Sequence, residues 1–579
     1  MKKILVLLFV LGYSVAEAQV NNVNKRLIDD LPKEIVSIQV NSNLLLAGES
    51  LLYKVEALNA ETKTESLISS SGYVSLIGNN DTIVFNQKIK LNDGKGSGYF
   101  FIPSNLASGS YELLGYTNFS KNNLTNPVDS KSLVIINPFV ASKNVRFADS
   151  LSKNVIRFEE KNRAALASAA SDNSLVDINL SKSVFSKRES VELNFKDVYG
   201  KILNGDLLLS VRKVMPVNLP ENLSQQKIFS EVNDNKTLYL PELRGEIISG
   251  KITATNNELP IINKVIALSI PGKNFITKLA KTDSEGNFLF SVSENYNSNE
   301  AIFQIVDVEK DNYTIKINSK SDVATYATTI PFPDIDMDLK EWLVERSISL
   351  QIENAFYGKK GDSIKSTSFD QPFFGNQGTN YVLDEYTRFP TMTETFVEIV
   401  FIAGVRRDGE KRKFIVKDYD ENASTNAFSS LEPMVLMDGV YIQNNDEVLD
   451  YNPDKVESIR VIPVPYRYGP KLFGGIISIL TKDGSFRPKS KDQPLETLEI
   501  NNFVEEKINY SPSYLDDQSL DRIPDNRVQL LWNPKFEMSK NSGKVNFFTS
   551  DETGIFEIKL SGITKGGENI SEKAYFKVE

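Results

Sequence analysis

The sequence predicts a mainly β fold, with several tandem β-sandwich domains plus one small α/β domain. Short segments of alternating apolar and polar residues recur about every ten residues, separated by turns that contain Gly, Asn or Asp, as in β-sandwiches. Hydrophobic residues make up 40% of the chain and charged residues 25%, the composition of an ordinary globular protein. The 579 residues are enough for about four domains of about 150 residues each.

Composition limits the chemistry that the chain can perform. It contains no Cys and no His, which excludes disulfides, thiol nucleophiles, His-ligated metals and Ser-His-Asp triads. The net charge of −10 argues against nucleic acid as a partner. We therefore expect a protein that is not an enzyme, with no catalytic residue, no cofactor and no metal. A hydrolase with a carboxylate pair or a Ser-Lys pair is the enzymatic alternative, but no cluster of such residues stands out.

Residues 1–18 have the pattern of a secretory signal peptide. Two lysines precede an apolar stretch from Ile4 to Val15 that is too short to span a bilayer, and an Ala-Glu-Ala cleavage site follows at 16–18. No later segment has about 18 consecutive apolar residues, so no transmembrane helix is expected. The chain is predicted to be exported, to the periplasm or in association with an outer membrane.

The first predicted domain spans residues 34–140. The segment 50–58 alternates so that Tyr53, Val55 and Ala57 share one face of a strand, and Gly48 provides the turn before it. Further strands are expected at 73–77, 82–89, 98–102 and 110–116. This spacing is typical of a sandwich.

Three motifs of this first domain resemble the macroglobulin-type domains of the α-macroglobulin group. They are Ala-Gly-Glu-Ser at 47–50, Gly-Tyr-Phe-Phe-Ile-Pro at 98–103 and Ala-Ser-Gly-Ser-Tyr-Glu-Leu at 107–113. The resemblance implies a β-sandwich. It does not imply protease trapping, because that chemistry needs a thioester Cys and the chain has none.

Two more sandwiches are predicted from strand patterns. One spans residues 141–243, with strands within 176–193 and 206–214 after a helix expected at 154–170. The other is a C-terminal sandwich at 527–579, which also resembles the macroglobulin-type domains.

Residues 244–325 are predicted to form a smaller sandwich. Strands are expected at 247–252 and 264–270, and the run Thr-Asp-Ser-Glu-Gly-Asn-Phe at 282–288 reads as a turn that enters a third strand. The pattern resembles the carboxypeptidase-regulatory-like domain, which commonly precedes outer-membrane receptor modules. The resemblance implies no peptidase activity.

A helical or irregular connector is predicted at 330–380. Asp338 is expected to cap a helix whose apolar residues between Leu339 and Leu350 share one face. The acidic residues at 334, 336 and 338 have the spacing of a calcium loop, but Leu339 stands where such a loop needs Gly. We interpret them as an acidic helix N-terminus.

Residues 381–485 carry the most distinctive motifs. A capping box at 391–394 begins a helix, and Met434–Met437 is a buried strand that enters an Asp-Gly turn. A short helix is expected from Asn452 and runs into a strand that ends near Ile462, and a Gly-Gly pair precedes a last strand at 476–482. These motifs, in this order, are similar to the plug domain of TonB-dependent outer-membrane receptors.

Two functions from different classes remain. The stretch after Ser485 is too short for a receptor barrel of up to about 22 strands, so the plug-like domain is expected to dock on, or occlude, a separately encoded outer-membrane β-barrel that serves transport or secretion. The alternative is a macroglobulin-like binding or adhesion module in which the plug-like domain is a structural spacer. The predicted docking residues belong to types enriched at interfaces. They are Tyr466, Arg467, Tyr468 and Phe473.

Overall fold

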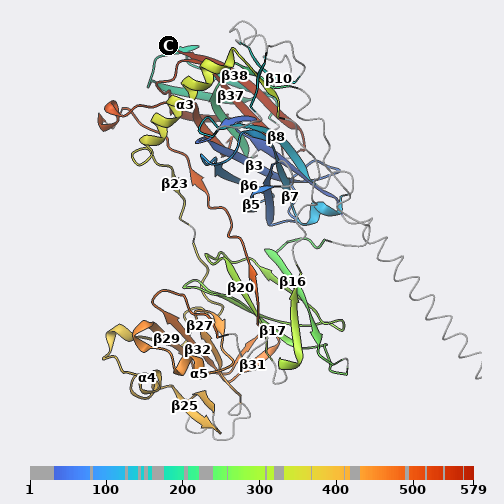
Figure 1. The fold of residues 1–579 in the computed structure, drawn as a ribbon, viewed down its shortest axis with the longest axis vertical. Coiled ribbons are helices and arrows are strands. Elements are labelled where there is room, and N and C mark those ends of the chain that lie inside the picture. Colours follow the sequence, from blue (N-terminus) through green and yellow to red (C-terminus); the bar gives the residue numbers. More distant parts are fainter. Residues whose placement is uncertain are drawn as a thin grey trace, which may run out of the picture.

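The computed structural model of the chain is mainly β, as predicted, and forms an upper and a lower lobe that are joined by a narrow waist (Figure 1). The predicted signal peptide lies outside the described residues. The described residues are 32–78, 82–123, 128–140, 145–148, 154–159, 175–200, 206–220, 239–256, 258–306, 310–318, 332–366, 368–409, 411–417, 431–489, 495–515, 518–538, 542–564 and 566–579.

The first sandwich, drawn in blue in Figure 1, belongs to the upper lobe. A sheet in the order β1-β3-β6 faces a sheet in the order β2-β8-β7-β4-β5. Tyr53, Val55 and Ala57 all lie in the core between the sheets, as their alternation predicts. The strands are β1 (Glu34–Val40), β2 (Leu44–Leu46), β3 (Ser50–Asn59), β4 (Ser71–Ile77), β5 (Ile83–Lys90), β6 (Lys95–Phe101), β7 (Gly109–Tyr116) and β8 (Asp129–Ile136).

The second sandwich combines two segments that the sequence predicts as separate sandwiches, 141–243 and 527–579. One sheet has the order β11-β13-β36 and the other β12-β38-β37-β14-β35. Because β14 lies between β37 and β35, with Leu209 opposite Leu560, neither segment forms these sheets alone. The strands are β11 (Val176–Leu180), β12 (Val184–Phe185), β13 (Ser190–Asp197), β14 (Leu207–Lys213), β35 (Gln529–Phe536), β36 (Ser542–Phe548), β37 (Gly554–Ile563) and β38 (Asn569–Val578).

A small sheet and one long helix cover the upper lobe. The sheet, in the order β15-β10-β22-β9, consists of β9 (Phe147–Ala148), β10 (Val155–Phe158), β15 (Val217–Asn218) and β22 (Asp334–Asp336). The helix predicted at 154–170 is therefore wrong at its start, where Val155 and Ile156 bury their side chains as strand residues. The rest of that helix from 160 onward lies outside the described residues.

Helix α3 (Leu339–Ala355) follows β22. Its buried side chains include Leu339, Leu343 and Leu350, the face that the sequence predicts. The predicted cap is wrong, because Asp338 has helical φ and ψ and its side chain accepts no capping hydrogen bond. The acidic residues at 334 and 336 belong to a strand rather than to the helix N-terminus.

The lower lobe begins with the third sandwich. Its sheets have the orders β19-β16-β21 and β18-β17-β20-β33. The last strand of the second sheet comes from the chain after the α/β domain, outside the predicted range 244–325. The strands are β16 (Glu246–Ala254), β17 (Val265–Ile270), β18 (Ile276–Lys281), β19 (Asn287–Val292), β20 (Glu300–Ile305), β21 (Tyr313–Ile317) and β33 (Leu495–Glu499).

The α/β domain, predicted as plug-like, is inserted between β21 and β33. Thr391 and Glu394 form the predicted capping box, and Asp438 and Gly439 form the predicted turn, both with positive φ. The central sheet has the order β24-β29-β32-β27-β28. The elements are β24 (Thr379–Val382), α4 (Met392–Glu398), β25 (Ala403–Asp408), β26 (Lys411–Val416), β27 (Met434–Met437), β28 (Val440–Tyr441), α5 (Asp446–Leu449), β29 (Val456–Ile462), β30 (Tyr466–Tyr468), β31 (Lys471–Phe473) and β32 (Ile476–Thr481).

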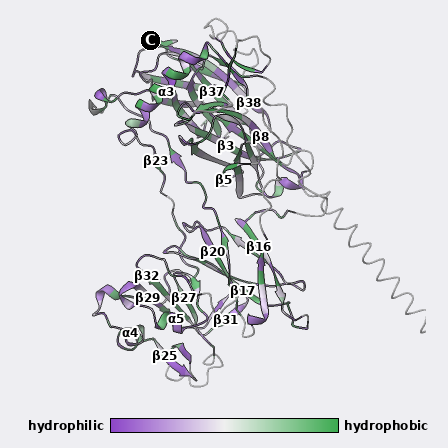
Figure 2. Ribbon diagram, in the orientation of Figure 1, coloured by the Kyte–Doolittle hydropathy of each residue, from purple (hydrophilic) through white to green (hydrophobic). Residues whose placement is uncertain are grey.

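Extended chain segments cross the waist. Two of them pair over a short length through β23 (Ser363–Ile364) and β34 (Lys507–Ile508). A third, residues 239–245, leads into β16. Hydrophobic stretches are concentrated in the sheets of both lobes (Figure 2). Among the described residues, no helix is long and apolar enough to cross a membrane.

Candidate binding cleft between the lobes

The predicted docking residues differ in burial, from fully buried Phe473 to exposed Arg467. Phe473 is 1% exposed and belongs to a core shared by the α/β domain and the third sandwich. The ring of Tyr468 stacks on Phe373 with a centroid distance of 3.7 Å, and its hydroxyl donates to the carbonyl oxygen of Thr277 at 2.5 Å. Tyr466 is half-buried and Arg467 is exposed. Phe473 is therefore part of an internal interface, against which the partly buried rings of Tyr466 and Tyr468 pack.

The hairpin β30-β31 lies tightly against the third sandwich for a local reason. Gly469 takes a φ of +53° at the hairpin tip, and a Cβ there would lie 2.9 Å from the carbonyl oxygen of Leu279. The turn between β27 and β28 is equally close, because a Cβ on Gly439 would lie 2.2 Å from the Cβ of Phe275. The α/β domain is thus packed onto the third sandwich by two close backbone approaches.

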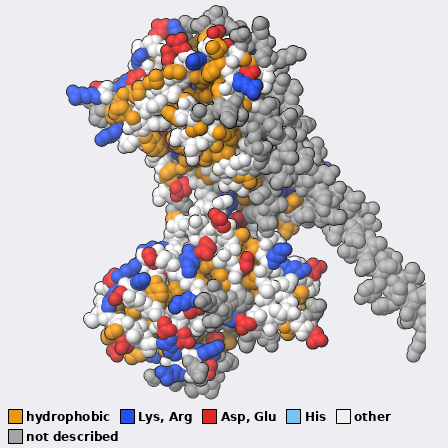
Figure 3. All heavy atoms as spheres, in the orientation of Figure 1, with side chains coloured by type: hydrophobic (Ala, Val, Ile, Leu, Met, Phe, Trp, Pro, Cys, Tyr) orange, Lys and Arg blue, Asp and Glu red, His pale blue; other side chains and the backbone are white. Residues whose placement is uncertain are grey.

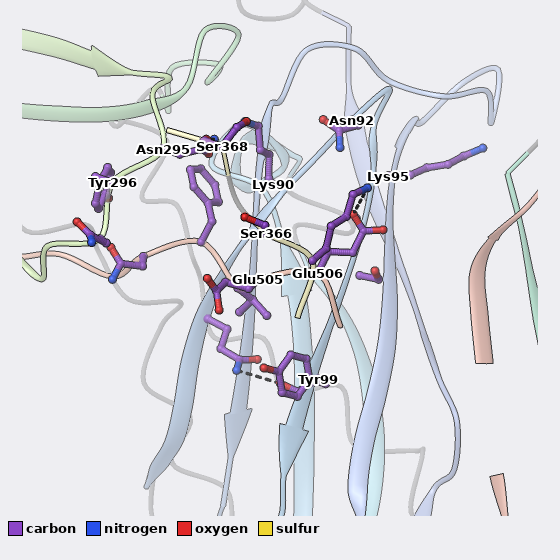
Figure 4. A pocket seen from close by; sticks show the side chains of 18 of the residues that line it. Lys90, Asn92, Lys95, Tyr99, Asn295, Tyr296, Ser366, Ser368, Glu505 and Glu506 are labelled. Atoms are coloured by element: carbon purple, nitrogen blue, oxygen red, sulfur yellow. Dashed lines mark hydrogen bonds and ion pairs between the residues drawn. The ribbon is translucent and has the colours of Figure 1, made fainter. Parts of the chain in front are cut away.

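A cleft of about 960 Å³ lies between the first sandwich and the lower lobe. Figure 4 shows that its labelled side chains come from three sources. The first sandwich contributes Lys90, Asn92, Lys95 and Tyr99, the lower lobe Asn295 and Tyr296, and the crossing segments Ser366, Ser368, Glu505 and Glu506.

One wall of this cleft is the edge strand β6, which among the described residues pairs only with β3. At its two ends, the N–H of Ile102 donates to Glu49 and the carbonyl of Gly94 accepts from Ala57. Hydrogen bonds in an antiparallel pair involve alternate residues, so the even-numbered residues bond to β3. The backbone groups of Ser97, Tyr99 and Phe101 consequently point away from β3, and the carbonyl of Tyr99 accepts a hydrogen bond from Nε2 of Gln87 at 3.1 Å.

Lys88 lies behind the cleft lining, where the lobes meet, and contacts two residues that line it, Tyr296 and Phe503. Its Nζ lies 2.5 Å from the carboxylate of Glu246 and 2.5 Å from the hydroxyl of Tyr296, and it lies 4.5 Å from the ring centroid of Phe503. Burial, with the nearby charge of Glu246, raises the pKa of Tyr296 far above its ordinary value, so this hydroxyl stays protonated. The first sandwich, the third sandwich and a crossing segment are joined at this one cation.

The crossing segment also covers part of the neighbouring edge strand β5. Phe503 forms a parallel bridge with Lys88, and the N–H of Val504 donates to the Lys88 carbonyl at 2.8 Å. Val504 packs against the core of the first sandwich. A segment of this chain therefore already pairs with β5, which is one of the two edge strands that border the cleft. The other edge strand is β6.

Aromatic and charged groups line the rest of the cleft. Phe101 is 51% exposed and Phe369 is 38% exposed, while Lys535 and Lys365 pair with Glu506. Among the described residues, no group of three or more acidic side chains is arranged to hold a metal ion. The arrangement suits non-covalent binding of a chain with both backbone and side-chain contacts.

Sequence reasoning missed this cleft, although one local signal was present. Phe100 and Phe101 are adjacent in a strand, so one of them has to face away from the core. The sequence pattern does not predict that β6 lies at the edge of its sheet, because that position depends on which strands pair with one another.

Helix α3 carries a second surface that the sequence analysis did not single out. Val344, Ile348 and Ile352 are 53%, 52% and 37% exposed, and their spacing of four residues places them on one face. Figure 3 shows hydrophobic side chains gathered on this part of the upper lobe. A row of this kind is more typical of an interaction surface than single exposed apolar residues are.

Comparison with known proteins leaves the family open. No protein-family model matches the chain, and no curated protein matches it. The plug-like and carboxypeptidase-regulatory-like assignments therefore stay predictions from their motifs.

Among solved structures, the chain is similar to Salmonella α2-macroglobulin reacted with methylamine, at 8% identity and a TM-score of 0.24, over 94% of this chain and 39% of the other. It is also similar to Escherichia coli α2-macroglobulin activated by porcine elastase, at 8% identity and a TM-score of 0.23, over 94% of this chain and 44% of the other. The Escherichia coli adhesin FdeC matches at 11% identity and a TM-score of 0.14, over 52% of this chain and 63% of the other. The chain spans about two fifths of these two macroglobulins, and its function has to be inferred from its own geometry.

Proposed function

We propose that the chain is an exported, non-enzymatic binding module that holds an extended polypeptide in the cleft between its lobes. The observation that carries this proposal is the open edge of β6, whose outward-facing backbone groups border the cleft. An extended chain that adds to such an edge gains backbone hydrogen bonds, and neighbouring pockets select its side chains.

Three features of the cleft support a polypeptide ligand. The crossing segment at 503–504 already bonds to β5, so the geometry of this region accommodates an added strand. The exposed rings of Phe101 and Phe369 provide apolar contact area beside the edge. The ion pairs of Glu506 with Lys365 and Lys535 lie at the same cleft and supply polar contacts.

The packing of the α/β domain favours this function over docking on a separate barrel. The predicted docking aromatics Tyr468 and Phe473 contact the third sandwich and Phe373, so they fix the domain within the lower lobe. In this proposal the plug-like domain is a structural part of the scaffold. Co-purification from envelope extracts separates the two functions, because only barrel docking requires a stoichiometric barrel partner.

The direct test removes one backbone donor from the edge. Ser97→Pro deletes an N–H that β3 does not use, and proline is tolerated on an edge strand at such a position. Ser97→Ala is the matched control, because it keeps the N–H. Peptides selected from a displayed random library on the unaltered protein are expected to bind Ser97→Ala normally and Ser97→Pro at least about tenfold more weakly. Equal binding to both variants would contradict addition to β6.

A further inference from the structure

A second cavity, of about 530 Å³, lies in the upper lobe where α3 meets both sandwiches. Three charged side chains converge there from elements far apart in the sequence. Glu49 follows the turn at Gly48 before β3, Arg212 lies on β14 and Arg346 lies on α3. The turn is held against α3, since Asn354 donates to the carbonyl of Gly48 at 3.0 Å.

The three side chains form a buried triad. Arg346 donates through Nε and Nη2 to Oε1 of Glu49, at 3.1 and 2.5 Å. Arg212 Nη2 lies 3.5 Å from Oε2 of the same carboxylate. The exposed fractions of the side chains are 7% for Glu49, 12% for Arg212 and 10% for Arg346. The two guanidinium groups hold the pKa of Glu49 below its ordinary value against the effect of burial.

This triad has one positive charge more than its single carboxylate can balance. The other cations that line the cavity are each paired with one acid, Lys360 with Glu353, Lys507 with Asp362 and Arg527 with Asp525. Glu49 and Arg346 are the charged groups that act on Arg212, and burial lowers its pKa. Since a guanidinium stays protonated in proteins, the excess charge is not removed by titration.

Hydrogen bonding in the triad is also incomplete. Nε of Arg212 and Nη1 of Arg346 are buried and have no hydrogen-bond partner among the described residues. Unsatisfied donors on buried charged groups are costly. A single added anion that reaches this end of the cavity would balance the charge and supply acceptors after small side-chain rotations.

The rest of the cavity wall is largely apolar. Leu52, Leu350, Tyr357 and Trp532 line it, and its volume is within the range of pockets that hold small molecules. A ligand that matches both the charged triad and the apolar wall carries one negative charge and an apolar group. A carboxylate fits the planar guanidinium fork, whereas a phosphate dianion brings more charge than the triad lacks.

We propose that this cavity binds a monocarboxylate with an apolar group, held by Arg212 and Arg346, from a fatty acid or from the C-terminal residue of a peptide. This site adjoins the cleft between the lobes, because Tyr99 and Phe101 line both cavities, but its charged end at Arg212 and Arg346 does not line the cleft and the proposal does not depend on the function proposed above. Glu49 sets its affinity, because it competes with the ligand for both guanidinium groups.

Titration calorimetry on the full chain tests the site with defined probes. Decanoate and N-acetyl-leucyl-phenylalanine represent the two sources, and decanol and the C-terminal amide of the same dipeptide are their neutral counterparts. At least one carboxylate is expected to bind, about tenfold or more tightly than its neutral counterpart. The tighter of the two carboxylates identifies the source.

Three variants separate a ligand site from a structural ion cluster. Arg346→Met leaves a balanced Glu49–Arg212 pair and is expected to lose carboxylate binding by about tenfold or more, whereas Glu49→Gln leaves two unbalanced cations and is expected to tighten it. Arg467→Met, which replaces an exposed residue in the other lobe, should leave the carboxylate affinity unchanged. Arg212→Met, which likewise leaves a balanced pair with Glu49, replaces Arg346→Met if that variant fails to fold. No carboxylate binding, equal binding of the neutral probes, or unchanged affinity in Arg346→Met would each overturn the proposal.

Discussion

The carboxyl group of Glu112 makes the stability of the first sandwich depend on pH. Glu112 is buried on β7, where it accepts a hydrogen bond from Ser132. Burial raises its pKa from 4.5 to about 7, against the smaller effects of that hydrogen bond and of Lys131. Below pH 4.5 the folded and unfolded states both keep the proton. Between pH 4.5 and 7 the unfolded state loses it first, so stability falls as pH rises.

We expect Glu112→Gln to remove this dependence. The amide keeps a partner for Ser132 and carries no charge at any pH. At pH 8 the variant should exceed the unaltered protein in stability by roughly 3 kcal/mol, and at pH 4 the two should agree. Hydrogen exchange at the amides of β7 measures this local stability. A difference that is the same at both pH values would mean that the Glu112 carboxyl is not the titrating group.

Asp438 organises the turn of the α/β domain through three hydrogen bonds. Its carboxylate accepts from the N–H and the hydroxyl of Thr481, at 2.7 and 2.6 Å, and from the N–H of Phe486 at 2.9 Å. Asp438→Ala leaves these buried donors without the carboxylate, at a cost of roughly 2–5 kcal/mol. Asp438→Asn should recover part of the loss, since its carbonyl oxygen still accepts. Urea denaturation of both variants gives the comparison, and equal stability of the alanine variant and the unaltered protein would contradict it.

At the scale of elements, some local signals in the sequence predicted local structure, whereas the cap expected at Asp338 is not formed. The capping box at Thr391 and the turn at Asp438 are formed as predicted, because each depends on residues within one turn. Pairing across the chain was not predictable. Strand patterns do not say that β14 lies between β35 and β37, or that β33 completes the third sandwich.

The candidate site was predicted least well for the same reason. The aromatic character of 466–473 was readable, but its burial against the third sandwich depends on how two domains pack. Composition of a segment alone does not separate an internal interface from an external one.

The contact between the α/β domain and the third sandwich can be tested with two glycines. Gly439 has a φ of +80° and its added Cβ would overlap Phe275, whereas Gly409 has a φ of +64° and nothing lies within 4 Å of an added Cβ. Gly409→Ala should cost only the backbone strain, about 1–2 kcal/mol. Gly439→Ala should cost clearly more and should raise hydrogen exchange in β18 and β27. Similar costs for the two variants would show that the close approach is absent.

At the scale of the whole molecule, the buried Lys88–Glu246 pair holds the lobes together. Lys88→Met leaves Glu246 buried without this cation, which is expected to cost roughly 3–5 kcal/mol at the waist. The exposed pair Lys573–Glu557 lies within one sheet, so Lys573→Met should have little effect. Small-angle X-ray scattering should show a wider distribution of distances between the lobes in Lys88→Met only. An unchanged scattering curve would mean that contacts other than the Lys88–Glu246 pair hold the two lobes in their relative positions.

The most direct test of the binding function is hydrogen exchange, residue by residue, along β6 with and without a peptide selected on the full chain. Even-numbered amides already bond to β3 and should change little. The amides of Ser97, Tyr99 and Phe101 should become protected together when the peptide binds, because an added strand takes up alternate backbone groups. Protection at the hairpin 466–473 instead, or no added protection at these three amides, would contradict the account.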